Sequence, residues 1–183
     1  LVGSSTMKEE RYADNLRFFR TSEKVFESSE PIYYPDDEVT LRLISYYPYQ
    51  EEGVNMGEST MSVAVETDQN LSAGYFCSDF LVASQNLQSA PKGAIALHYD
   101  HKFFKLKIAL VGKEGEELQG ILDADPKLSV CGFYTKAIYD FQKETYSAFS
   151  NEKSITPAGK WEIQGDRLSG KEAVSYTHLT LPM

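Results

Sequence analysis

The sequence predicts an all-β protein built from antiparallel strands. Apolar and polar residues alternate in several short stretches, as they do in strands that are buried on one face. Turn-forming residues separate these stretches, and no long segment with helical periodicity lies between them. A parallel sheet would need such helices as crossover connections, so the pattern favours an antiparallel sandwich or barrel. The 183 residues, 42% of them hydrophobic, supply one domain-sized core.

The first predicted elements lie near the amino end. Tyr12, Leu16 and Phe19 fall at helical spacing among charged residues, which predicts a short amphipathic helix over residues 7–20. Residues 32–49, IYYPDDEVTLRLISYYPY, contain a Pro-Asp-Asp turn signal followed by alternating apolar residues. They predict a half-buried strand that leaves a turn and ends in a cluster of tyrosines.

The middle of the chain predicts strands and one helical turn. The stretch MSVAVET begins at Met61 and predicts a strand with Val63 and Val65 on the same face. The stretch SDFLVASQ begins with two N-cap candidates, Ser78 and Asp79, and predicts one helical turn. Four later strands are predicted, in residues 93–99, 103–112, 127–141 and 159–165.

A change in the phase of the pattern predicts an interruption between the first two of these later strands. Up to Tyr99 the odd-numbered residues are apolar, but from Phe104 onward the even-numbered ones are. Since alternate residues of a strand share a face, this shift requires a bulge or turn near residues 100–103. The glycine-containing stretch GKEGEELQG, residues 112–120, is interpreted as a hairpin loop.

Two histidines lie at this interruption, but their spacing does not predict a metal site. His98 and His101 would point to opposite faces of a strand, and no third His or Cys lies at a motif spacing from them. We therefore interpret them as structural residues at a bulge. Cys77 and Cys131 are too far apart in sequence to form a metal-binding knuckle, and we expect two buried side chains.

The histidine region resembles the central strand motif of the fimbrillin-like (Mfa-like) family of Bacteroidetes surface lipoproteins and pilus subunits. The motif residues are Leu97, Tyr99, His101, Lys102, Lys105, Leu106, Ile108 and Leu110. Other stretches match the family in the same order, namely IYYPDDEVTLRLISYYPY, SDFLVAS, GFYTKAIYDF and WEIQGDRLSGKEA. The resemblance covers about residues 30–174, within the first domain of such a subunit.

The resemblance implies a non-enzymatic, exported cell-surface subunit that needs no cofactor. The family's fold is a Greek-key sandwich likened to transthyretin, with short helical turns, and a second similar domain follows it. The resemblance also implies a lipid-anchored precursor, delivery to the outer membrane and, in polymerising members, cleavage by an arginine-specific protease. The cleavage removes an N-terminal strand, and the groove that this strand leaves accepts a donor strand from a neighbouring subunit. A host protein or glycan is a further expected partner. Arg17 and Arg20 are the candidate cleavage sites.

A carbohydrate-binding sandwich module is the alternative from a different functional class. Tyr46, Tyr47 and Tyr49 offer flat apolar faces with polar tips, and Trp161 lies on a later predicted strand. We name these four residues as candidate glycan contacts. The same side chains would serve equally well in the core and at the edges of a sandwich.

Patterns for nucleotide binding and catalysis fail. The stretch GDRLSGKE has the glycine and lysine spacing of a phosphate loop, but Glu172 stands where Ser or Thr should bind magnesium. We interpret it as a polar turn after the Trp161 strand. Nucleophilic catalysis needs a base, and before the tail only His98 and His101 are available. We therefore expect that the chain is not an enzyme and that it has no catalytic residue and no metal ligand.

Charge and the two ends bound the remaining possibilities. A formal net charge of −9 disfavours nucleic acid and anionic membranes as partners. The stretch from Val174 to Pro182 resembles translated sequencing-adapter DNA from metagenomic assemblies, and the opening Leu-Val-Gly-Ser is interpreted similarly. We therefore expect residues 7–174 to form the domain, and residues 1–6 and 175–183 not to be native.

Overall fold

The computed structural model describes residues 2–5, 8–22, 25–34, 40–89 and 91–175, and it confirms the all-β prediction. Strands make up 50% of the chain and helices 7%. Every strand pair with a described register is antiparallel. The predicted turn signal at residues 35–37, Met7 and the tail from residue 176 lie outside the described residues.

The chain forms two compact units, each assembled from segments that are distant in sequence. The first unit comprises residues 1–61, 81–100 and 140–144, and the second comprises residues 62–80, 101–139 and 145–183. Among the described residues, neither of the two helices is long and apolar enough to cross a membrane.

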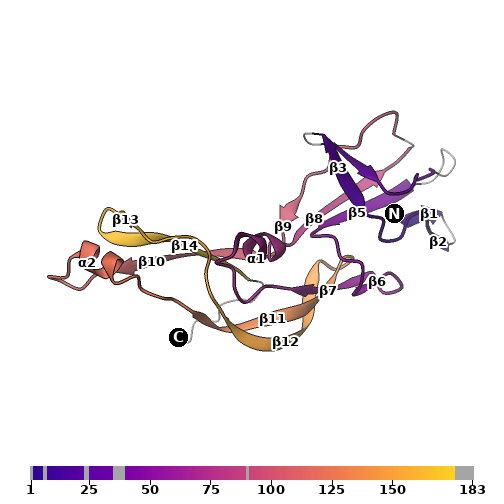
Figure 1. The fold of residues 1–183 in the computed structure, drawn as a ribbon. Coiled ribbons are helices and arrows are strands. Elements are labelled where there is room, and N and C mark those ends of the chain that lie inside the picture. Colours follow the sequence, from indigo (N-terminus) through magenta and orange to yellow (C-terminus); the bar gives the residue numbers. More distant parts are fainter. Residues whose placement is uncertain (1, 6–7, 23–24, 35–39, 90, 176–183) are drawn as a thin grey trace. The chain divides into compact units, whose positions relative to one another are not determined.

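The first unit contains one sheet and a separate hairpin. The sheet order is β2-β1-β5-β8-β9, and β5 pairs with β8 from Leu41 opposite Leu87 to Tyr47 opposite Leu81 (Figure 1). Leu41 and Leu87 are buried in this unit. The hairpin pairs β3 with β4. The strands are β1 (Val2–Ser5), β2 (Lys8–Arg11), β3 (Phe18–Ser22), β4 (Val25–Ser28), β5 (Thr40–Tyr47), β6 (Val54–Asn55), β8 (Leu81–Leu87) and β9 (Asp100–His101).

The second unit contains two sheets and both helices. One sheet has the order β10-β14-β13, and the other has the order β12-β11-β7-β6. Strand β7 begins in the first unit, where it pairs with β6, and continues into the second. The elements are β7 (Thr60–Ala64), α1 (Ser72–Cys77), β10 (Phe104–Val111), α2 (Leu118–Asp123), β11 (Val130–Asp140), β12 (Thr145–Ile155), β13 (Glu162–Gln164) and β14 (Arg167–Ser175).

Alternation of side chains builds the core of the second unit. In β11, Phe133 and Tyr139 are buried while Tyr134 between them is exposed. The ring of Phe104 on β10 lies 6.2 Å from the ring of Phe133, and this contact links the two sheets. Leu168 on β14 has no solvent-exposed surface. The pattern that predicted the strands therefore also places their buried faces.

Several sequence predictions are confirmed. Met61 and Val63 in β7 and Val65 directly after it are buried, and the later strands β10, β11 and β13 lie within their predicted stretches. The chain is interrupted at residues 102–103 between β9 and β10, as the change of phase required. In β10 the even-numbered residues are half-buried and the odd-numbered ones exposed.

The helix predicted over residues 7–20 is wrong. Strands β2 and β3 occupy this stretch, and Asn15 between them has a φ of 46°, which no helix accommodates. The amide Nδ2 of Asn15 donates to the carbonyl of Gln50 at 2.9 Å, which stabilises the bend. Three apolar residues at helical spacing were too few to outweigh strand pairing.

Three local predictions also need correction. Ser78 does not begin a helical turn but follows α1, and its hydroxyl donates to the carbonyl of Gly74 at 2.7 Å. Residues 93–99 form no strand, because no described segment pairs with them. Only the next two residues, Asp100–His101, form a strand. The stretch 112–120 is not a simple hairpin loop, since α2 begins within it at Leu118.

Candidate functional site

The outer edge of β10 is the candidate functional site. β10 is eight residues long and pairs with β14 on one side only. Among the described residues, no other backbone hydrogen bond reaches residues 104–111. An edge strand of this length presents a row of unpaired N–H and C=O groups to any strand that can lie beside it.

The hydrogen bonds of β14 show which groups of β10 face outward. The backbone N–H and C=O of Val174 both bond the side-chain amide of Gln69, each at 2.8 Å. The same two groups of Glu172 bond Ala158, at 3.0 and 2.8 Å. In an antiparallel strand the N–H and C=O of one residue point to the same side, so Glu172 and Val174 point away from β10.

The register then assigns the open groups. Lys105 lies opposite Val174, and Lys107 lies opposite Glu172. Because neither partner turns its backbone toward β10, both are non-hydrogen-bonded pairs. The N–H and C=O of Lys105 and Lys107 must therefore point away from β14, along the open edge.

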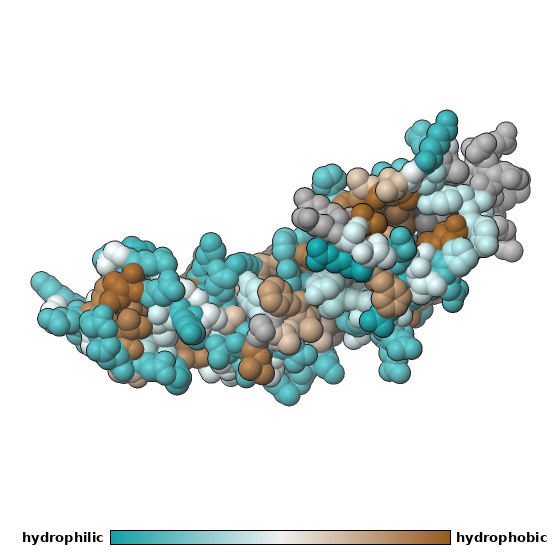
Figure 2. Space-filling view, turned by 45° about the horizontal axis from the view of Figure 1, so that its top comes forward, coloured by the Kyte–Doolittle hydropathy of each residue, from teal (hydrophilic) through white to brown (hydrophobic). Residues whose placement is uncertain are grey.

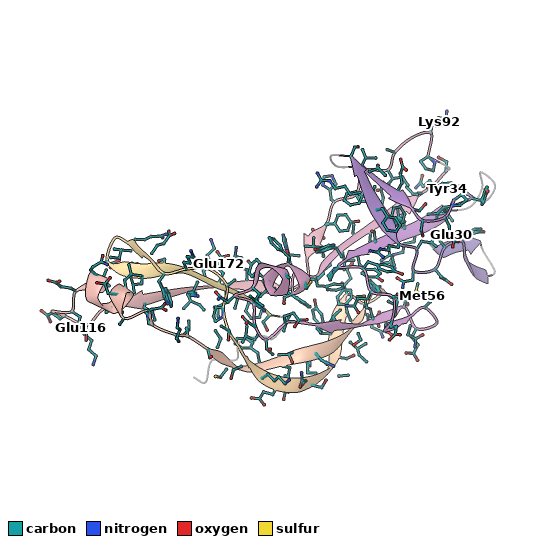
Figure 3. The ribbon with its side chains drawn as sticks, viewed as in Figure 1. Glu30, Tyr34, Met56, Lys92, Glu116 and Glu172 are labelled. Carbon is teal, nitrogen blue, oxygen red and sulfur yellow. The ribbon has the colours of Figure 1, made fainter. Side chains whose placement is uncertain are left out.

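The two faces of β10 differ in chemistry. Phe104, Leu106, Ile108 and Leu110 form a half-buried apolar row on one face. The other face carries exposed lysines, and Nζ of Lys105 lies 2.5 Å from Oε2 of Glu172 on β14, the residue labelled in Figure 3. The hydrogen bond from Lys105 lowers the pKa of Glu172. An added strand would extend the apolar row on one face and meet positive charge on the other.

The apolar surface continues at the loop end of this sheet. Val111, the last residue of β10, is 67% exposed, and Ile163 on β13 is also exposed. Leu118, Ile121 and Leu122 of α2 are half-buried or exposed rather than covered. Figure 2 shows this as brown surface at the end of the molecule where α2 lies.

The other described edge strands suit strand addition less well. β12 is longer, but Ala148 and Asn151 within it have φ values of 51° and 59°, which interrupt the flat geometry that a new ladder needs. β13 has three residues, and β6 and β9 have two each. β10 is the longest edge strand in the described residues that contains no positive φ.

The candidate cleavage arginines lie at the exposed hairpin. The carbonyl of Arg17 accepts a hydrogen bond from the N–H of Ser29 at 2.9 Å, just before β3. Its guanidinium carbon lies 4.9 Å from the ring centre of Phe19 and 5.5 Å from that of Tyr49. Arg20 lies within β3, opposite Phe26. Both arginines are exposed, but both backbones are held in the paired hairpin.

Two of the four candidate glycan contacts are not exposed. Trp161, in the second unit, is only 8% exposed, and its Nε1 donates to the carbonyl of Pro126 at 2.8 Å. Tyr46, in the first unit, is half-buried, and its hydroxyl donates to Asn15 and to Gln50. Burial raises the pKa of Tyr46. Only the remaining two, Tyr47 and Tyr49, are exposed, by 45% and 37%.

The histidines and cysteines build no reactive centre among the described residues. Nδ1 of His101 lies 2.7 Å from Oδ1 of Asp79, and both His98 and His101 are exposed. No group of three His, Cys, Asp or Glu side chains in the described part is placed to hold a metal ion. The prediction that Cys77 and Cys131 are buried is wrong, since both are exposed free thiols. Cys77 is the last residue of α1, and Cys131 lies near the start of β11.

The phosphate-loop spacing lies in a hairpin. Gly165 and Asp166 form the turn between β13 and β14, and strand rather than helix follows them. Glu172 is engaged by Lys105. The predicted polar turn is confined to Gly165 and Asp166, and the rest of the stretch, from Arg167, belongs to strand β14.

Comparison with known proteins identifies the family. A model of the fimbrillin-like family matches residues 1–183, a wider stretch than the sequence motifs cover. The chain belongs to the fimbrillin-like family. No curated protein matches this fimbrillin-like chain.

Two solved structures resemble the fimbrillin-like chain. One is a candidate cell adhesion protein from Bacteroides uniformis ATCC 8492, with 19% sequence identity and a TM-score of 0.59 over 95% of this chain and 65% of that one. The other is a candidate cell adhesion protein from Bacteroides ovatus ATCC 8483, with 14% identity and a TM-score of 0.56 over 82% of this chain and 55% of that one. The likeness shows the antiparallel sandwich fold. The chain spans less than two thirds of the length of either structure.

Sequence reasoning missed the residues that define the open edge. The family motif included Lys105, but nothing in it showed that Lys107 faces a free edge. That fact depends on Gln69, which lies 105 positions before its partner Val174. A lone glutamine between β7 and α1 gives no periodic signal, so only the three-dimensional structure reveals its role.

Proposed function

We propose that this fimbrillin-like chain is a structural subunit of a cell-surface fibre or adhesin, and that it joins a neighbouring subunit by strand pairing at β10. The observation that carries this proposal is the open edge of β10, with outward-facing backbone groups at Lys105 and Lys107 and a half-buried apolar row beside them. A strand laid along this edge would gain ladder hydrogen bonds and cover apolar surface at once.

Membership of the family supports the proposed setting. We infer an exported precursor with a lipid anchor, delivered to the outer membrane, in which residues 7–174 are the first domain of a longer subunit. The two neighbouring structures, which are longer than this chain, are consistent with a further domain. Cleavage after Arg17 or Arg20, at the β3–β4 hairpin, would release the segment before it, including β1, and would open the edge of β5 that β1 covers, a second edge distinct from that of β10. An isolated two-stranded hairpin is only marginally stable in water, so this one can open for a protease.

Strand addition can be tested with a proline substitution. Lys107→Pro removes one outward N–H without removing a bond to β14, and edge strands tolerate proline at such positions. An eight-residue peptide with alternating apolar residues should bind the full chain and raise its melting temperature. The Lys107→Pro variant should stay folded and lose this binding. Binding to Lys107→Pro with unchanged affinity would place the acceptor edge elsewhere.

A glycan contact at Tyr47 and Tyr49 is the second candidate, because both rings are exposed on the first unit and Tyr49 lies beside the Arg17 guanidinium. A glycan array should then give a hit that Tyr47→Ala or Tyr49→Ala abolishes. Tyr33→Ala, which removes the most exposed tyrosine of the unit, is the matched control. An array without hits, or a hit that survives both substitutions, would rule out this candidate.

A further inference from the structure

We propose that the strand accepted by β10 carries an aspartate or glutamate opposite Lys107, with an apolar residue on each side of it. This inference rests on the proposed strand pairing and adds the chemistry of the partner. It follows from the direction of the backbone groups, the charge on one face of β10 and the apolar row on the other.

The backbone geometry fixes which partner residue meets Lys107. In a partner strand that adds antiparallel to β10, as every pair with a described register in this chain is, the residue that exchanges both hydrogen bonds with Lys107 lies directly opposite it, and its side chain points to the same face. Cross-strand neighbours of this kind have Cβ atoms about 5 Å apart, which is within reach of an ion pair. The residue opposite Lys107 therefore decides whether the pair attracts or repels.

Lys107 is the more weakly paired of the two lysines, since the lowered pKa of Glu172 is due first to Lys105 and last to Lys107. Glu172 lies across from it on β14, but the Oε2 of Glu172 bonds Nζ of Lys105 and accepts from the hydroxyl of Tyr75 at 3.2 Å. Lys107 is exposed and forms no ion pair with a described residue. Lys105 already has its counter-ion, so the position opposite Lys105 selects charge less strongly.

The flanking partner residues meet the apolar face. Leu106 and Ile108 lie on either side of Lys107 and are only half-buried. The neighbours of the partner's acidic residue project to this same face and can cover them. Their burial favours aliphatic or aromatic residues, at about 25 cal/mol for each Å² of apolar surface removed from water. The predicted core of the partner motif is thus apolar, acidic, apolar.

The overall charge of the chain does not override this local preference. A net charge of −9 repels an acidic peptide at long range. At physiological ionic strength, however, charges farther apart than about 8 Å are largely screened. The contact between Lys107 and its opposite residue lies inside that distance and decides the selection.

Three end-blocked eight-residue peptides that differ at one central position test the inference. All carry alternating apolar residues, and the central position is Glu, Gln or Lys. With the full 183-residue chain, fluorescence anisotropy should show the Glu peptide binding about threefold more tightly than Gln and about tenfold more tightly than Lys. Lys107→Glu should reverse this order.

A control variant separates the alternatives. Lys136→Glu makes the same charge change on β11, which lies between β12 and β7, and should leave the order unchanged. Loss of the preference in Lys136→Glu, or its persistence in Lys107→Glu, would overturn the assignment to Lys107. Equal binding of all three peptides would overturn the charge rule but leave the proposed strand pairing intact. Binding of none would overturn both.

Discussion

β14 and β10 are neighbours in one sheet, yet every edge of β14 is closed while β10 has one edge open. β10 covers one side of β14, and β13, Ala158 and Gln69 cover the other in turn. No comparable cover lies along the outer side of β10 in the described residues. The difference shows that closing a strand edge requires dedicated residues, and that leaving one uncovered creates a binding surface.

The closure of β14 depends most on two glycines. A Cβ atom at Gly159 would lie 2.0 Å from the carbonyl oxygen of Gly170, and one at Gly170 would lie 2.2 Å from that of Lys160. Their φ values are +90° and +102°. We expect Gly159→Ala or Gly170→Ala to reduce the free energy of unfolding by about 3 kcal/mol or more, through clash and backbone strain. Denaturant unfolding measures this loss.

Gly120 provides the control for these substitutions. It lies within α2 and has no neighbour within 4 Å of an added Cβ. Gly120→Ala should stabilise the chain by about 0.5–1 kcal/mol, because alanine favours the helix. If Gly159→Ala or Gly170→Ala reduced the free energy of unfolding by no more than ~0.5 kcal/mol, the backbones at residues 159–160 and at Gly170 would not approach as closely as described.

Gln69 is the next test of the closed edge. Its side chain is fully buried and satisfies both backbone groups of Val174. Gln69→Leu should cost about 2–3 kcal/mol of unfolding free energy, because two buried backbone groups lose their partner. Gln164→Leu, at an exposed position on β13, should stay within about 0.5 kcal/mol of the unmodified chain. Equal effects of the two would refute the capping role of Gln69.

Two single proline substitutions at adjacent positions compare the paired side of β10 with its open side. Ile108 directs its backbone toward Lys171 on β14, whereas Lys107 directs its own outward. Ile108→Pro should cost on the order of 2–3 kcal/mol, since a ladder bond is lost and its acceptor is left without a partner. Lys107→Pro should cost less than about 1 kcal/mol. Thermal unfolding that ranks them in the opposite order would reverse the assigned backbone directions.

The ion pair that joins the two strands gives the smallest expected effect. The hydrogen bond from Lys105 lowers the pKa of Glu172 from its ordinary value of 4.5. The pair therefore stabilises the fold fully above pH 4.5, and this contribution is lost as the pH falls through the lowered pKa. Glu172→Gln should cost less than about 1 kcal/mol at pH 7 and progressively less below pH 4. The free energy of unfolding of both chains can be measured from pH 3 to 7. A destabilisation by Glu172→Gln that became larger at acid pH would contradict this account.

The sequence predicted where strands lie better than it predicted which strands pair. Alternation located β7, β10 and β11, because a strand buried on one face must alternate. It failed for residues 93–99, where the alternation is present but no segment of the described part of the chain pairs alongside. Pairing depends on distant segments, and periodicity within one segment carries no information about them.

The candidate site was only partly accessible from sequence. The motif drew attention to Lys105 and Leu106, but the open edge follows from Gln69 and Ala158, which no pattern singled out. Two of the aromatic candidates are not exposed: Trp161 is a core residue with a satisfied indole N–H, and Tyr46 is half-buried. Composition cannot distinguish a buried aromatic ring from a binding one, since both uses favour the same side chains.

Residue-resolved amide hydrogen exchange tests the open edge most directly. In the free chain, the amides of Lys105 and Lys107 should exchange rapidly, while those of Leu106 and Ile108 are protected by bonds to β14 and that of Val174 by its bond to the side chain of Gln69. Adding the apolar peptide with a central glutamate should protect Lys105 and Lys107 and change the others little. Protection of both lysine amides in the free chain, or their rapid exchange with saturating peptide, would contradict strand pairing at β10.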